Sequence, residues 1–102
     1  MGVGSKKDPL YYNRVMRKVT LEILTSPNCT HCEAFLSYWG KEGAKWPSVV
    51  MRELSILTPE GQTAALKYQI FASPAIIINN ELFDVGGFNK KQLEERLAAL
   101  SK

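Results

Sequence analysis

The chain after residue 18 changes several times between two hydrophobic patterns. Residues 19–24 are rich in apolar and β-favouring side chains, which predicts a strand, and the turn-prone residues 26–28 end it. Residues 32–39 carry apolar side chains at i, i+3, i+4 and i+7, which predicts a helix with one buried face. We expect this helix to run to about residue 39, because Gly40 and Gly43 loosen its end.

A second strand and a second helix follow. Residues 48–56 alternate in a way that predicts a strand with mixed faces. Thr58, Pro59 and Glu60 then have the order of an N-cap, a proline in the first helical position and an acid in the first turn. We therefore expect a short helix that runs to about Tyr68.

The last third of the chain predicts a hairpin and a closing helix. Residues 75–79 form a short apolar run typical of a buried strand, and residues 81–85 can fold back beside it. Asn89 can cap the final helix, with Gln92 three positions on. The buried stripe of this helix consists of Leu93, Leu97 and Leu100. The expected order after residue 18 is β-α-β-α-β-β-α.

Composition indicates one ordinary globular domain. The chain has 102 residues, of which 45% are hydrophobic and 23% are charged. A chain of this size can form a single core without structural disulfides or metal sites. We expect residues 19–102 to form this domain. The beginning of the sequence has no apolar region of the kind that directs export, and no apolar run is long enough to span a membrane. We therefore expect a cytoplasmic protein that does not bind membranes.

The net charge of +3 is concentrated at the start of the chain. Residues 1–18 hold five basic residues and one acidic residue, whereas the remainder holds eight basic and nine acidic residues. The basic excess therefore belongs to an N-terminal extension and not to a face of the domain, so we expect no nucleic-acid partner. We expect this extension to be solvated and partly disordered, and a short helix over residues 8–18 is the alternative.

Cys29 and Cys32 are the only cysteines of the chain, and they lie between the first predicted strand and the first predicted helix. Two thiols at this spacing can close a small disulfide ring, and a helix N-terminus favours a thiolate on the first of them. In a reducing compartment such a pair of cysteines is more often catalytic or metal-binding than a permanent structural disulfide. Zinc would need a ligand beyond Cys29, His31 and Cys32, so we expect redox chemistry without a metal or an organic cofactor.

The order of elements, the Cys-x-x-Cys motif after the first strand and Ser73-Pro74 before the third together resemble the thioredoxin-like superfamily over residues 19–101. The resemblance implies an α/β fold in which helices flank a central mixed four-stranded sheet. It also implies that Cys29 is the attacking thiol and Cys32 the resolving thiol. The cis-proline of the family falls on Pro74.

The same resemblance implies a substrate-binding surface beside the thiols. In the family, the backbone of the residue before the cis-proline pairs with an extended substrate, and that residue is Ser73. Phe71, Ala72 and Phe88 fall on positions that flank the thiols, where they can form an apolar patch for a peptide. Ordinary packing of these three residues is the alternative.

The chain departs from thioredoxin around the motif. Asn28 stands where thioredoxin usually has tryptophan, and Ile23 stands where thioredoxins carry a buried aspartate. Glu22 is adjacent to that position, but neighbouring strand residues point to opposite faces. We therefore expect that Glu22 does not replace the missing proton acceptor.

His31, directly before the second cysteine, is the most informative departure. Disulfide-forming and isomerising enzymes often carry histidine at this place. An imidazolium near Cys29 would stabilise its thiolate, so we expect a less reducing potential than that of thioredoxin. An exposed histidine with little effect is the alternative.

Glutaredoxin is the competing relative. Residues 25–29 resemble its approach to the active site, and Gly86-Gly87 resembles its glycine pair, but Ser26 stands where that family commonly has lysine. We expect a monomeric thiol–disulfide oxidoreductase that acts on protein disulfides and accepts electrons from a thioredoxin-reductase-like donor or glutathione. A glutathione-dependent reductase and a non-catalytic binding module are the alternatives.

Overall fold

A computed structural model describes residues 18–101 of the chain. The expected basic extension and the alternative short helix over residues 8–18 lie outside the described residues, except for Lys18. The strands are β1 (Val19–Thr25), β2 (Val49–Ser55), β3 (Ala75–Ile78) and β4 (Glu81–Val85). The helices are α2 (Thr30–Glu42), the short 3-10 helix η2 (Gly43–Lys45), α3 (Pro59–Tyr68) and α4 (Lys90–Leu100).

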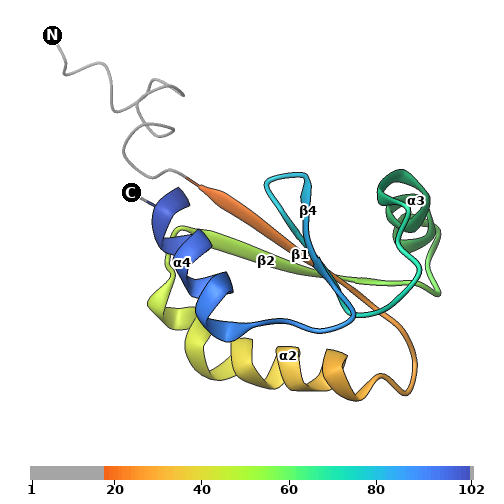
Figure 1. Ribbon diagram of the computed structural model, residues 1–102, viewed down its shortest axis with the longest axis horizontal. Coiled ribbons are helices and arrows are strands. Elements are labelled where there is room, and N and C mark those ends of the chain that lie inside the picture. The colour runs from red at the N-terminus through yellow and green to blue at the C-terminus, as the bar shows by residue number, and fades with distance from the viewer. Residues whose placement is uncertain (1–17, 102) are drawn as a thin grey trace, which may run out of the picture.

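The four strands form one mixed sheet in the order β2-β1-β3-β4. β1 runs parallel to β2, and the other two pairings are antiparallel. Helices α2 and α4 cover one face of the sheet and α3 lies on the other (Figure 1). The expected element order and the mixed four-stranded α/β sheet are confirmed.

The two faces of the sheet carry cores of different size. Successive strand residues point to opposite faces, so β1 contributes Leu21 and Ile23 to one core and Leu24 to the other. The larger core, under α2 and α4, consists of Val19, Leu21, Ile23, Phe35, Ile76, Ile78, Leu93 and Leu97. The smaller core, under α3, consists of Leu24, Leu54 and Ala75. All four residues of β3 are buried, because helices cover both sides of this strand.

The ends of the elements follow the predicted caps with one exception. The Thr58 side chain accepts a hydrogen bond from the Gly61 N–H, and the Asn89 side chain accepts one from the Gln92 N–H. The prediction that the first helix ends near residue 39 is wrong, since α2 continues to Glu42 and leads into η2. Gly40 does not end the helix because it lies on the exposed side, where no other group crowds it.

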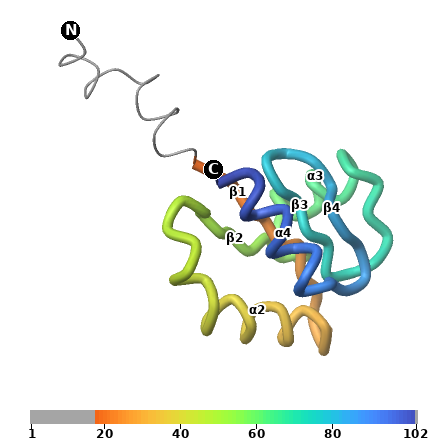
Figure 2. The backbone as a smooth tube through the Cα atoms, turned by 60° about the vertical axis from the view of Figure 1, so that its left-hand side comes forward, coloured from red at the N-terminus to blue at the C-terminus, as the bar shows by residue number. Residues whose placement is uncertain are grey.

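Residues on the α3 side form a small charged network. The Arg52 guanidinium lies 3.7 Å from a Glu22 carboxylate oxygen and also pairs with Glu60 of α3. Glu22 therefore points away from α2, as the alternation along β1 predicts. The last turn of α4 closes the opposite end of the domain, beside the start of β1 (Figure 2). There the Ser48 hydroxyl donates to the Ser101 hydroxyl at 3.2 Å.

No helix within residues 18–101 has the length and apolar character needed to cross a membrane.

Gly61 allows α3 to lie against the end of β2. A Cβ atom at this position would lie 1.9 Å from the Ser55 carbonyl oxygen, much closer than any real contact. Gly40, also inside a helix, has nothing within 4 Å of the place of its Cβ. The two glycines therefore form a matched pair in which only Gly61 makes a close backbone contact.

We predict that Gly61→Ala lowers the free energy of unfolding by about 1–3 kcal/mol, because α3 must move away from β2. Gly40→Ala should raise it by about 0.5–1 kcal/mol, because alanine favours a helix and meets no obstacle. Urea unfolding of both variants measures the difference. Similar free energies for the two variants would contradict the role of Gly61.

Candidate active site

The loop between β1 and α2 places Cys29 at the helix N-terminus. Asn28 has a φ of 58°, a left-handed conformation that asparagine tolerates better than most residues. Cys29 then occupies the N-cap, where its Sγ accepts a hydrogen bond from the Cys32 N–H at 3.1 Å. This is the place where serine, threonine or aspartate usually satisfies the first N–H groups of a helix. The sulfur of Cys29 therefore lies in the positive field of the helix end.

Cys29 and Cys32 form a disulfide, with their Cα atoms 5.1 Å apart. The two sulfurs are not equivalent in their surroundings. Cys29 is half-buried, whereas Cys32 is only 3% exposed and faces the sheet. Cys29 is therefore the more accessible of the two cysteines.

The loop between α3 and β3 meets the disulfide from the other side. The Ser73–Pro74 peptide bond is cis, and Pro74 is fully buried. The Ser73 hydroxyl lies 3.5 Å from Cys29 Sγ, although the two residues are 44 positions apart in the chain. The Pro74 carbonyl accepts a hydrogen bond from the Gly86 N–H at 2.7 Å, which holds the loop to the end of β4.

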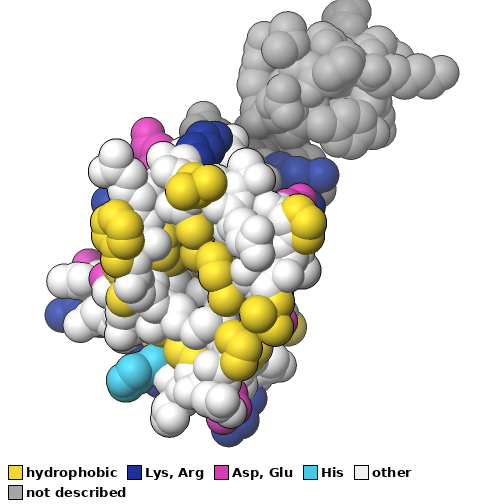
Figure 3. All heavy atoms as spheres, turned by 90° about the vertical axis from the view of Figure 1, so that its right-hand side faces the viewer, with side chains coloured by type: hydrophobic (Ala, Val, Ile, Leu, Met, Phe, Trp, Pro, Cys, Tyr) yellow, Lys and Arg dark blue, Asp and Glu magenta, His cyan; other side chains and the backbone are white. Residues whose placement is uncertain are grey.

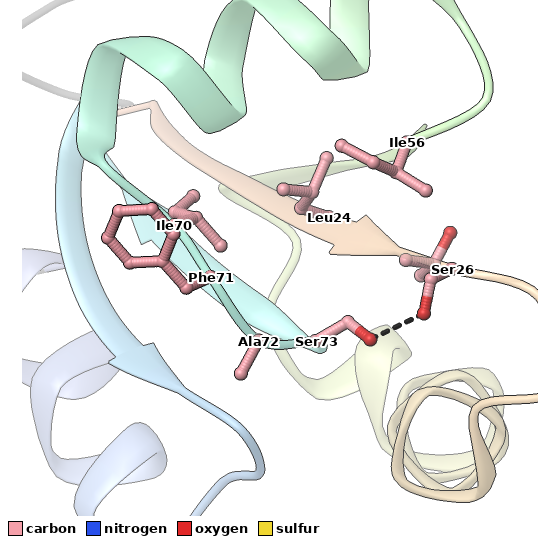
Figure 4. A pocket seen from close by; sticks show the side chains of 8 residues that line it. Leu24, Ser26, Ile56, Ile70, Phe71, Ala72 and Ser73 are labelled. Atoms are coloured by element: carbon pink, nitrogen blue, oxygen red, sulfur yellow. Dashed lines mark hydrogen bonds between the residues drawn. The ribbon is translucent and has the colours of Figure 1, made fainter.

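Ser26, which the sequence marks only as a departure from the lysine of glutaredoxins, also belongs to this cluster. Its hydroxyl lies 2.5 Å from the Ser73 hydroxyl, and the two side chains point toward each other across the gap between their loops (Figure 4). The residues are 47 positions apart, and no local pattern in the sequence marks the contact. Ser26 Oγ, Ser73 Oγ and Cys29 Sγ are therefore joined by two successive contacts, and we call these three atoms the hydroxyl row.

An apolar pocket of about 250 Å³ opens beside the two serines. Its lining consists of Leu24, Thr25, Ser26, Ile56, Ile70, Phe71, Ala72 and Ser73. The Phe71 side chain is 94% exposed, which is unusual for so large an apolar group. Apolar side chains gather around a hollow on this end of the molecule (Figure 3).

The residues predicted for the apolar patch divide into two groups. Phe71 and Ala72 line the pocket together with Ser73. Phe88 does not line it: the ring is half-buried and packs against Phe35 and Tyr38 of α2, with centroids 5.0 Å and 5.4 Å away. The geometry therefore links Phe88 to the core under α2.

Next to Phe88, Tyr38 connects α2 to α4 through a hydrogen bond. Its hydroxyl donates to a carboxylate oxygen of Glu94 at 2.8 Å. Burial raises the pKa of Tyr38, and the neighbouring Glu94 carboxylate raises it further. Tyr38 is therefore a neutral hydrogen-bond donor throughout the physiological range.

His31 lies in the first turn of α2 and is exposed to solvent. The histidine protrudes at the rim of the face that carries the apolar side chains (cyan in Figure 3). Ile23, at the aspartate position of thioredoxins, is fully buried. Within residues 18–101, no group of three or more histidine, cysteine or acidic side chains is arranged to hold a metal ion.

Solved structures of thioredoxins share this fold. Thioredoxin F from spinach chloroplast superposes with a TM-score of 0.68 over 94% of this chain and 89% of its own, at 21% identity. The thioredoxin of Fasciola hepatica gives a TM-score of 0.66 over 97% of this chain and 94% of its own, at 18% identity. At such identities the likeness defines the class of fold, which is thioredoxin-like.

Sequence relatives narrow the class to a family. A thioredoxin of Methanocaldococcus jannaschii is 34% identical over 82 residues, which cover 80% of this chain and 95% of the relative. A probable thioredoxin of Archaeoglobus fulgidus is 30% identical over 80% of this chain and 89% of its own length. No protein-family model matches the chain. The chain belongs to the thioredoxin family and is a thiol–disulfide oxidoreductase.

Proposed function

We propose that Cys29 and Cys32 are the reacting pair, and that they reduce disulfide bonds of other proteins by exchange. The Cys29 thiolate attacks one substrate sulfur, the bond between the substrate sulfurs breaks, and the departing sulfur takes up a proton. The Cys32 thiolate then attacks Cys29 Sγ and releases the second substrate thiol. The two electrons come from the dithiol, which becomes an internal disulfide.

The different exposure of the two cysteines carries this assignment of roles. Only Cys29 is open to a substrate, and its sulfur already accepts the N–H of Cys32 at the helix N-terminus. A hydrogen bond and a helix dipole both favour the charged form of a thiol. The buried Cys32 needs to reach only its neighbour, which suits a resolving thiol.

The donor that returns the two electrons is a separate protein or small thiol. We propose a thioredoxin-reductase-like protein as this donor and the reducing cytoplasm as the compartment, because a catalytic dithiol must be kept reduced. We also propose that the protein works as a monomer. Glutathione is the competing donor. Recycling by glutathione at rates equal to those with a thioredoxin reductase would favour it.

A protein substrate would lie across the loop that contains Ser73 and Pro74. Proline has no N–H, so the backbone of Ser73 is the natural partner for an extended substrate strand. Next to it, the pocket and the exposed ring of Phe71 offer apolar surface for a substrate side chain. Ala72 lies between these two features, and Phe88 supports the site from beneath α2.

We predict that Cys29→Ser abolishes reduction of a protein disulfide, because the attacking sulfur is lost. Cys32→Ser should accumulate a mixed disulfide between Cys29 and the substrate, because the resolving sulfur is lost. Non-reducing electrophoresis and mass spectrometry identify the adduct. A stable adduct on Cys32 in the Cys29→Ser variant would reverse the roles.

We predict that His31→Ala makes the pair more reducing by on the order of 10–30 mV, because an imidazolium stabilises the reduced, thiolate form. His31→Lys keeps a positive charge and is the matched control. Equilibration with glutathione buffers measures the potentials, and equal values for wild type and His31→Ala would show that the histidine has little effect.

We predict that Phe71→Ser raises KM for a protein disulfide about threefold to tenfold, because a substrate loses apolar contact area. The rate with a small aromatic disulfide should not change. Leu66→Ser is the matched control, since Leu66 is also exposed, at 81%, but lies outside the pocket. Equal effects of the two substitutions would exclude a specific role for Phe71.

A further inference from the structure

In the hydroxyl row, Ser26 Oγ, Ser73 Oγ and Cys29 Sγ can each accept a hydrogen bond. Only the two hydroxyls carry a proton to donate when Cys29 is a thiolate. A hydroxyl carries one proton and two lone pairs, so Ser73 can donate either to Ser26 or to Cys29. The distances to these atoms are 2.5 Å and 3.5 Å. When Cys29 is a thiolate, its negative charge makes it the stronger acceptor.

Ser26 decides which way the Ser73 hydroxyl points. If Ser73 donates to Cys29, its oxygen has lone pairs free for Ser26, and the Ser26 hydroxyl must be the donor between the serines. We propose that Ser26 is a positioning residue that donates to Ser73 and thereby directs the Ser73 hydroxyl onto the Cys29 thiolate. The inference rests on the proposed function of Cys29.

The backbone on both sides of this contact is held in place. Thr25, directly before Ser26, is buried and donates to a Glu53 carboxylate oxygen at 2.8 Å. The Thr25 carbonyl also accepts the N–H of Ile56 at 2.8 Å. On the other side, Ser73 precedes the fully buried Pro74. The two hydroxyls therefore meet because their chain segments are fixed, and not through chance rotation of free side chains.

The surroundings strengthen the effect of these hydrogen bonds. Ser26 and Ser73 are both half-buried and stand at the edge of an apolar pocket. In such surroundings a hydrogen bond is screened less than in water, and consecutive hydroxyls polarise one another. The same contact serves Cys29 as a nucleophile and later as the leaving group, when a second thiol of the electron donor attacks the donor sulfur of the mixed disulfide on Cys29, because both states carry charge on the Cys29 sulfur.

The alternative is that the serines only join two loops. The chain offers a control for this case, since Ser48 and Ser101 form another serine pair at the opposite end of the domain from the thiols. Loss of either pair removes one hydroxyl–hydroxyl bond. Only loss of the Ser26–Ser73 bond should change the chemistry of Cys29.

The experiment measures the alkylation rate of Cys29 in the reduced full-length protein, at a pH where the thiol is only partly ionised. Under this condition the rate follows the fraction of thiolate, which the ultraviolet absorbance of the thiolate reports independently. We expect Ser73→Ala to slow alkylation about tenfold and Ser26→Ala about threefold. The double variant should equal Ser73→Ala, because Ser26 acts only through Ser73.

Two further variants complete the test. Ser26→Thr retains a hydroxyl and should restore the wild-type rate, and Ser48→Ala should leave the rate unchanged. Urea unfolding confirms that each variant is folded. An unchanged rate in Ser26→Ala, or additive effects of the two alanine substitutions, would overturn the inference. If the wild type does not reduce protein disulfides, the proposed function fails, whereas these alkylation rates still test the hydroxyl row.

Discussion

The active site depends on the antiparallel pairing of β1 with β3. In this pairing Leu24, near the end of β1, lies opposite Ala75, the first residue of β3. The segment that leaves β1 toward Cys29 and the segment that enters β3 through Pro74 therefore meet at one edge of the sheet. Without this register, Ser73 could not lie against Cys29 across 44 positions of the chain.

The residues that meet at this edge of the sheet explain the proposed thiol–disulfide exchange. The helix N-terminus and the half-buried position of Cys29 suit an attacking thiolate, and the buried Cys32 suits a resolving thiol. The apolar Ile23 occupies the aspartate position, so no carboxylate lies there to act on the thiols. The polar side chains that reach the Cys29 sulfur are instead the hydroxyls of Ser73 and, through it, Ser26. This chain thus combines a thioredoxin fold with its own polar surroundings for the dithiol.

Features with local causes were predictable from the sequence. Thr58 before Pro59 marked the start of α3, and the cysteine spacing marked the pair that forms the disulfide. Features that depend on contacts between residues far apart in the chain could not be predicted from the sequence. The exposed Gly40 let α2 continue, and the meeting of Ser26 with Ser73 depends on β-strand register rather than on any pattern near either residue.

The proposed function requires that Cys29 is the thiol that reacts with other molecules. The most direct measurement reduces the wild-type protein, exposes it briefly to a limiting amount of alkylating reagent and locates the label by peptide mass spectrometry. We expect label on Cys29 with little on Cys32, because Cys32 is 3% exposed whereas Cys29 is half-buried. Equal labelling, or label mainly on Cys32, would contradict the assignment of Cys29 as the attacking thiol.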